Sequence, residues 1–244
     1  MKYTTTIEDI KRAALQLLGA NLSDDIYGQS IPELIEKDDT YAQYLVNMDA
    51  SINRAIKRMV QKGVLPDKTY TLEYAESYQD GIAVNGGDMV VSVEKLIDGF
   101  RELKRVDFID RRGNIYQDVD YGVLGDDILL KALQENERYV FTYSYAPAQI
   151  SPIMALSQQA TDWKNAEIAA KNTGEGAYNK NTLDIPDDLA SIIPKFVFGE
   201  LYMHDEPSVA MYQGINPFEA YLSDYKPPES VKNNQIKNIF GVFN

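Results

Sequence analysis

The fold is decided by the segment from Thr40 to Tyr74, which reads TYAQYLVNMDASINRAIKRMVQKGVLPDKTYTLEY. Its first part predicts one long helix, from Thr40 to Lys62, because apolar residues recur at spacings of three and four. This stripe comprises Tyr41, Tyr44, Leu45, Met48, Ile52, Ala55, Ile56, Met59 and Val60. Gly63 and Pro66 end the helix, since glycine favours the position after a helix and proline cannot continue one.

After Pro66 the apolar period changes from 3.6 to 2, which is typical of β-strands. Residues 85–88 (NGGD) indicate a hairpin turn, and residues 110–114 (DRRGN) indicate a second polar turn. Strand patterns cover residues 69–74, 89–93, 100–110, 127–130 and 138–145. We therefore predict an antiparallel β unit of about five strands over residues 68–147.

Helical patterns precede this β unit. Thr6 is the expected N-cap of a helix over residues 7–18, and Gly19 lies where a helix ends. A second helix is expected to begin near Pro32, after a polar loop.

Helical patterns also follow the β unit. One apolar stripe covers residues 153–163, and a polar loop with glycines follows it. Pro186 begins a helix that Pro194 should kink or divide. Pro207 is expected to start the next helix, and Asn216 to cap a last short one.

These patterns predict an α+β protein in which N- and C-terminal helices pack together as a helical bundle domain. The first part of this helical domain spans residues 1–67, and the second part spans residues 148–226. An antiparallel β domain, residues 68–147, is inserted between them. An extended C-terminal arm, residues 227–244, is expected to follow.

Composition excludes several kinds of chemistry. The 244 residues carry a formal net charge of -13, contain no Cys and contain a single His. Disulfides, cysteine nucleophiles, thiolate metal sites and multi-histidine metal sites are thereby excluded. We expect no membrane span and an intracellular site of synthesis, because no apolar run is long enough to span a bilayer or to form a signal peptide. The acidic balance argues against a protein that grips nucleic-acid phosphates, and the 17 Tyr indicate amphipathic surfaces and interfaces.

Motifs for catalysis or metal binding are weak. No phosphate-binding loop fits the glycines. Asp118 and Asp120 suggest a calcium site that Asp126 and Asp127 could complete, but the EF-hand pattern fails and solvated turn residues are favoured. His204 is explained by a helix C-terminus, which favours a positive charge. No pair of carboxylates is singled out for hydrolysis, so we expect no catalytic residue, no metal and no cofactor.

The C-terminal tail is the segment most indicative of binding. After a polar stretch it carries five apolar side chains, namely Ile236, Ile239, Phe240, Val242 and Phe243. Apolar side chains on a free terminus need a surface that buries them. They either dock on their own domain or insert into another subunit, for example by adding a strand to a sheet edge.

Two stretches resemble the head–tail connector (adaptor) proteins of tailed bacteriophages. The first covers residues 6–19, TIEDIKRAALQLLG, and precedes the long helix with Asn47 and Ile52. The second covers residues 185–202, IPDDLASIIPKFVFGELY. It resembles a helix of that family in which an acidic Pro-Asp-Asp start precedes an Ile-Pro step and a Glu-Leu-Tyr end.

The resemblance implies a non-enzymatic structural protein of the virion neck that is assembled in the host cytoplasm. Such proteins form homo-oligomeric rings, usually dodecamers, beneath the portal protein. They extend the DNA channel and join the head to a tail protein or a second neck-ring protein. The five apolar residues of the tail would then anchor the arm to the portal.

The net charge of -13 has a physical role if the resemblance holds. An acidic channel wall repels DNA phosphates, so that the duplex passes without specific binding. Two alternatives stay open at this point: another virion component such as a tail-completion protein, and a carboxylate-dependent hydrolase.

Overall fold

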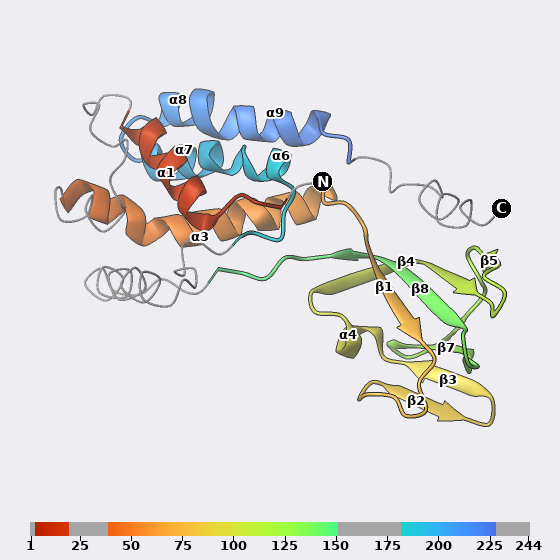
Figure 1. Ribbon diagram of the computed structural model, residues 1–244. Coiled ribbons are helices and arrows are strands. Elements are labelled where there is room, and N and C mark those ends of the chain that lie inside the picture. The colour runs from red at the N-terminus through yellow and green to blue at the C-terminus, as the bar shows by residue number, and fades with distance from the viewer. Residues whose placement is uncertain (1–2, 20–38, 151–181, 228–244) are drawn as a thin grey trace, which may run out of the picture. The chain divides into compact units, whose positions relative to one another are not determined.

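The computed structural model describes residues 3–19, 39–150 and 182–227 of the chain (Figure 1). The chain is mixed α+β and separates into two compact units. Among the described residues, the first unit is helical and combines residues 3–19 and 39–64 with residues 147–150 and 182–226. The second unit, residues 65–146, contains the strands and one short helix. The helix expected near Pro32, the stripe at 153–163 and the C-terminal arm lie outside the described residues.

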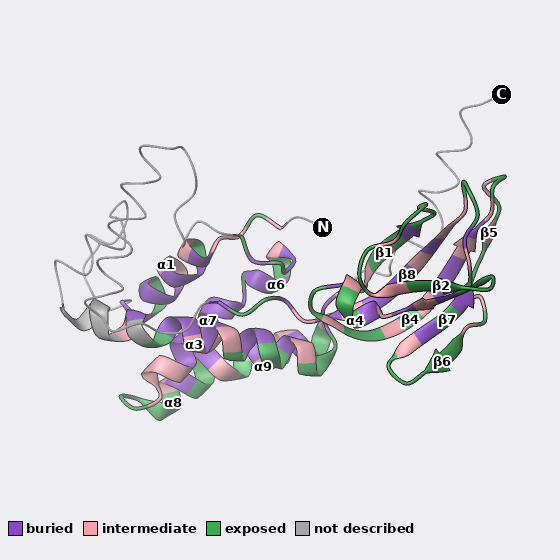
Figure 2. Ribbon diagram, turned by 90° about the horizontal axis from the view of Figure 1, so that it is seen from below, coloured by how far each residue is buried: buried purple, intermediate pink, exposed green. Residues whose placement is uncertain are grey.

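The helical unit is built around α7 (Ile193–Tyr202), which contacts both α1 (Ile7–Leu18) and α3 (Asp39–Lys62). The limits of α1 and α3 confirm the predicted helices to within one residue. Thr6 caps α1 as predicted, and Asp9 completes a capping box by accepting from the Thr6 backbone N–H at 2.9 Å. The core of the unit includes Leu15, Ile52, Met59, Ile193, Val197 and Phe218. Figure 2 shows this buried seam along α1, α3 and α7.

Pro194 divides its helix, as predicted. The short helix α6 (Asp187–Ala190) ends before α7 begins, and Pro194 lies in the first turn of α7. Proline is tolerated there because the backbone N–H of a first-turn residue has no partner within the helix.

The prediction that a helix begins at Pro207 is confirmed, but the prediction that Asn216 caps a separate last helix is wrong. Helix α8 (Pro207–Val209) continues through a π-helix, η2 (Ala210–Ile215), into α9 (Asn216–Asp224). Asn216 has helical backbone angles, and its N–H donates to Met211 O, five residues back. The wider turn lets Pro217 lie within a continuous helical segment without a break.

The β unit contains two four-stranded sheets, and every pair of neighbouring strands is antiparallel. The first has the order β1 (Lys68–Glu73), β8 (Arg138–Tyr145), β4 (Phe100–Ile109) and β5 (Ile115–Tyr116). The second has the order β2 (Ile82–Asn85), β3 (Asp88–Val91), β7 (Asp127–Lys131) and β6 (Gly122–Leu124).

The described strands number eight, so the expectation of about five is too low. The additional strands β2, β5 and β6 have two to four residues each, too few for a period of two to be detected. The predicted strand 89–93 also ends early, because Val93 begins a short helix, α4 (Val93–Leu96). The hairpin turn at Gly86 and Gly87 is confirmed, and both glycines adopt positive φ angles of 63° and 97°.

Candidate functional site

The apolar residues predicted to bind a partner lie outside the described part of the chain. These residues are Ile236, Ile239, Phe240, Val242 and Phe243. The described residues offer three candidate regions. These are the acidic turn and the histidine indicated by the sequence, the junctions between helices, and the surface of the β unit.

The acidic residues around Asp118 make separate contacts and do not converge on one point. The Asp118 backbone has a positive φ of 51°, and its N–H donates to Asp107 Oδ1 at 2.9 Å. Asp127 accepts from the Ser92 hydroxyl at 2.5 Å, while Asp120 is exposed. Within residues 3–19, 39–150 and 182–227, no three acidic or histidine side chains form a group suited to a metal ion. The turn interpretation fits these contacts better than a calcium site.

His204 lies on the surface, two residues after the end of α7. The adjacent Asp205 carboxylate accepts a hydrogen bond from the Tyr44 hydroxyl of α3 at 3.4 Å. An exposed imidazole in this position fits the helix-end interpretation.

The N-terminal segment is tied to the start of α6 by one carboxylate. Asp187 accepts from the side-chain hydroxyls and backbone N–H groups of both Thr4 and Thr5, at 2.6 to 2.8 Å. These hydrogen bonds, led by that from the Thr4 hydroxyl, hold the pKa of Asp187 well below its ordinary value of 3.8. Leu183 N also donates to Thr5 O at 3.1 Å. These bonds hold the residues just before the first resembling stretch against the second stretch, and helices α1 and α7 of the two stretches pack together.

A buried ion pair joins α1 to α3. Lys11 Nζ lies 2.7 Å from Asp49 Oδ1, and both side chains are almost fully buried. The short distance makes this an ion pair, although Asp49 Oδ1 receives no well-aligned hydrogen bond. Burial lowers the pKa of Lys11, and the neighbouring Asp49 opposes that effect.

Three further ion pairs connect α3 to the C-terminal helices, and one of them joins Lys62 to Glu219 at 3.4 Å. Arg54 pairs with Glu200 of α7 at 2.7 Å, and Arg58 pairs with Glu219 of α9 at 2.6 Å. Ser51 adds a hydrogen bond to Glu200 at 2.7 Å. These polar contacts fix how the N-terminal and C-terminal helices pack.

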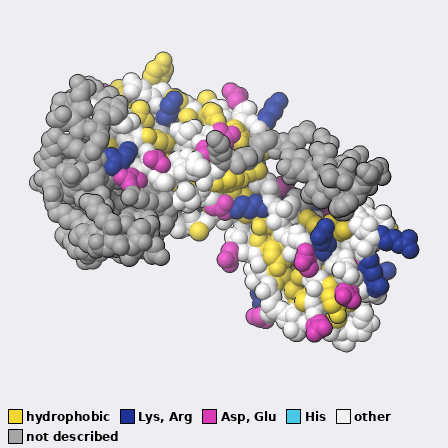
Figure 3. Space-filling view, in the orientation of Figure 1, with side chains coloured by type: hydrophobic (Ala, Val, Ile, Leu, Met, Phe, Trp, Pro, Cys, Tyr) yellow, Lys and Arg dark blue, Asp and Glu magenta, His cyan; other side chains and the backbone are white. Residues whose placement is uncertain are grey.

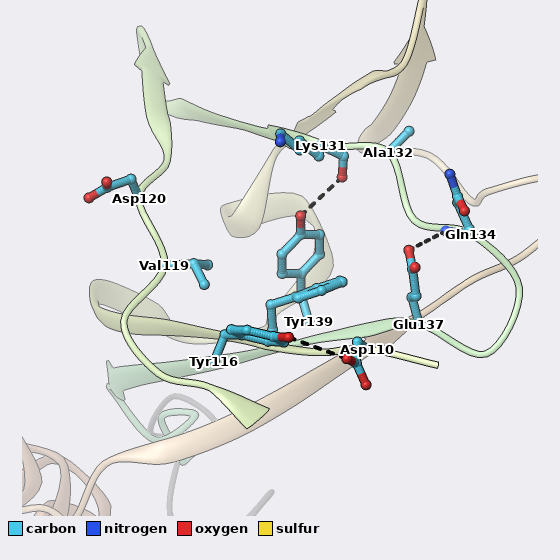
Figure 4. Close-up of a pocket in the computed structure, with 10 residues that line it drawn as sticks. Asp110, Tyr116, Val119, Asp120, Lys131, Ala132, Gln134, Glu137 and Tyr139 are labelled. Carbon is cyan, nitrogen blue, oxygen red and sulfur yellow. Dashed lines mark hydrogen bonds between the residues drawn. The ribbon is translucent and has the colours of Figure 1, made fainter. Parts of the chain in front are cut away.

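The β unit contains a concave site of about 590 Å³ (Figure 4). Its aromatic residues Phe108, Tyr116 and Tyr139 come from β4, β5 and β8 of the first sheet, and Lys131 comes from β7 of the second. Figure 4 shows the Tyr139 ring pointing toward Lys131. The Tyr139 hydroxyl donates to the Lys131 carbonyl at 3.1 Å. The remaining lining residues are Asp110, Val119, Asp120, Ala132, Gln134 and Glu137.

An apolar hairpin lies next to this cavity in sequence. Val123 and Leu124 of β6 are 73% and 63% exposed, and β6 is an edge strand among the described strands. Figure 3 shows apolar patches together with side chains of both charge signs on the visible face of the β unit. Exposed apolar residues on a sheet edge are a feature of interaction surfaces.

No known protein family matches the chain, and no curated protein sequence matches it either. None of the helices in the described ranges is both long and apolar enough to cross a bilayer. Sequence reasoning missed the cavity, because its residues come from strands of two different sheets and from the loops between strands, which only the tertiary fold brings together. The signal available in the sequence was the abundance of Tyr, which indicates amphipathic surfaces without locating them.

Proposed function

We propose that this protein is a structural component of a tailed-bacteriophage neck, a head–tail connector that forms a homo-oligomeric ring beneath the portal protein. In this proposal the N- and C-terminal helices form a bundle domain, and residues 227–244 extend as an arm whose apolar end binds the portal. The ring extends the DNA channel and joins the head to a tail or second neck-ring protein.

The observation that supports the proposal most is the contact between the two stretches that resemble the connector family. Helix α1 packs on α7, and the Asp187 carboxylate binds the backbone and side chains of Thr4 and Thr5. Stretches separated by more than 160 residues therefore belong to one packed helical unit. Within the helical unit, the buried polar residues Lys11, Asp49 and Ser51 all take part in contacts that join helices.

The negative charge supports a role around DNA. A net charge of -13 disfavours tight binding to phosphates and allows a duplex to slide past the protein surface. The proposal expects the acidic side chains to face the channel of the assembled ring, and a basic lumen would contradict this part.

Native mass spectrometry of the full chain, alone and mixed with the portal protein of the same phage, tests the proposal. The expected result is a single large homo-oligomer, or a monomer that assembles into a ring once the portal is added. A strictly monomeric protein that ignores the portal would contradict the proposal.

A truncated chain ending at residue 228 tests the arm separately. The expected result is an unchanged melting temperature together with weaker binding to the portal. Unfolding of the truncated chain would instead show that the tail belongs to the core of its own subunit.

A further inference from the structure

The cavity of the β unit has an aromatic floor that is only partly used for core packing. The Phe108 ring lies 5.9 Å from that of Tyr116 and 5.3 Å from that of Tyr139, centroid to centroid. Tyr139 is buried, but Tyr116 remains 50% exposed. An exposed ring held in place by neighbouring rings offers a rigid, flat apolar surface within a concave site.

Two carboxylates that line this cavity, those of Asp110 and Glu137, accept hydrogen bonds from neighbouring residues. Asp110 accepts backbone N–H groups from Arg112 and Asn114 at 2.8 and 2.9 Å, as well as the Asn114 side-chain amide at 2.8 Å. Glu137 accepts the Gln134 N–H at 2.9 Å and lies 3.3 Å from the Arg111 guanidinium. Both carboxylates can accept further hydrogen bonds, and so can the exposed carboxylate of Asp120, which also lines the cavity.

Donors complete the rim. The Lys131 ammonium and the Gln134 amide are both exposed, and the Tyr139 hydroxyl can still accept a hydrogen bond while it donates to Lys131 O. Burial raises the pKa of Tyr139, so this hydroxyl stays protonated at neutral pH. The site therefore mixes donors and acceptors around an aromatic plane. Figure 4 shows Gln134 and Glu137 on one side of that plane and Lys131 above it.

We propose that this cavity binds a neutral saccharide, with a sugar ring stacked on Tyr116. A sugar presents an apolar C–H face to an aromatic ring, and its hydroxyls both donate and accept, which matches the mixed rim. An anionic ligand would require a cluster of cations, whereas Lys131 is the single cation among the described residues that line the cavity. The volume of about 590 Å³ falls within the range of small-ligand sites. This inference goes beyond the proposed neck function and does not depend on it.

Saturation-transfer difference NMR on the full chain tests the inference, with maltose, cellobiose, lactose and chitobiose as four separate probes at millimolar concentration. The expected result is saturation transfer to the ring C–H protons of at least one disaccharide. The Tyr116→Ala variant should lose most of this transfer. The matched control, Tyr212→Ala, removes a tyrosine that is 77% exposed in the helical unit and should leave the transfer unchanged.

A second variant distinguishes a loss of sugar binding from a loss of folding. Gln134→Ala alters an exposed rim side chain and should weaken binding severalfold without changing the melting temperature. The inference is overturned if none of the four disaccharides receives saturation, or if transfer persists unchanged in Tyr116→Ala. It is also overturned if N-acetyl-lysine amide binds in place of the sugars, since that result would identify a cationic peptide site.

Discussion

Lys11 and Asp49 form an ion pair at 2.7 Å inside the helical unit, with side-chain exposures of 0% and 5%. The pair links α1 to α3, two helices whose buried residues are mostly apolar and include Leu15 and Met48. Its consequence for stability is asymmetric. Replacing both charges by apolar groups can be tolerated, whereas removing one leaves the other buried and uncompensated.

We predict that Asp49→Ala lowers the free energy of unfolding by about 3–5 kcal/mol, because it leaves the Lys11 ammonium buried without its counter-charge. The double variant Lys11→Met with Asp49→Leu should recover a large part of this loss. Urea unfolding followed by circular dichroism measures both. Equal losses in the single and double variants would show that the pair contributes through packing alone.

Asp187 should make the attachment of the N-terminal segment sensitive to acid. Hydrogen bonds from Thr4 and Thr5 depress the pKa of the folded state below the ordinary value of 3.8. Stabilisation by a depressed carboxylate is fully present above its unfolded pKa and is lost as the pH falls through its folded pKa. We expect hydrogen exchange of the Thr5 backbone amide to accelerate as the pH falls below 3.8, the ordinary pKa of an aspartate. In Asp187→Ala this exchange should be fast already at neutral pH.

The control for Asp187 is Asp224→Asn, which alters an exposed carboxylate at the end of α9. It should leave the exchange rate at Thr5 unchanged at every pH. Protection of Thr5 that survives in Asp187→Ala would contradict the role given to this carboxylate.

Gly199 and Gly214 meet at the contact between α7 and the π-helix η2. A Cβ atom placed on Gly214 would lie 2.5 Å from Gly199 Cα, and one placed on Gly199 would lie 2.9 Å from Ile215. Alanine normally stabilises an exposed helix relative to glycine. Here we predict that Gly214→Ala instead lowers the free energy of unfolding by about 1–3 kcal/mol or more, because the packed helices must separate.

Thermal unfolding measures the effect of Gly214→Ala. The neighbouring Gln213→Ala is the control, since Gln213 is exposed in the same π-helix and its truncation should change little. An unchanged or raised melting temperature for Gly214→Ala would rule out the close contact.

We expect Leu124 to contribute to contacts with another molecule more than to the stability of its own subunit. Because its side chain is 63% exposed, Leu124→Ser should change the free energy of unfolding by no more than about 0.5 kcal/mol. The buried Ile128 of β7, which pairs with Val123 of β6, provides the contrast, and Ile128→Ser should cost several times more. Chemical unfolding of both variants distinguishes them, and a large loss in Leu124→Ser would place this side chain in the core of the subunit.

Local signals made much of the secondary structure predictable. The Thr6 cap, the end of α3 near Gly63, the turn at Gly86 and the division at Pro194 each depend on a few adjacent residues. The short strands and the π-helix were not predictable in this way. A strand of two or three residues carries no period, and the π-helix is stabilised by the contact of Gly214 with a helix that precedes it in the chain.

By itself, the sequence determined the α+β class, the limits of the long helices and the absence of cysteine chemistry, because composition, capping and periodicity are local properties of the chain. Only the tertiary structure decided that Lys11 pairs with Asp49, that Asp187 binds Thr4 and Thr5, and that three aromatic rings line one cavity. Each of these relationships joins residues distant in sequence, and their partners are selected by packing and strand register, which no local pattern encodes.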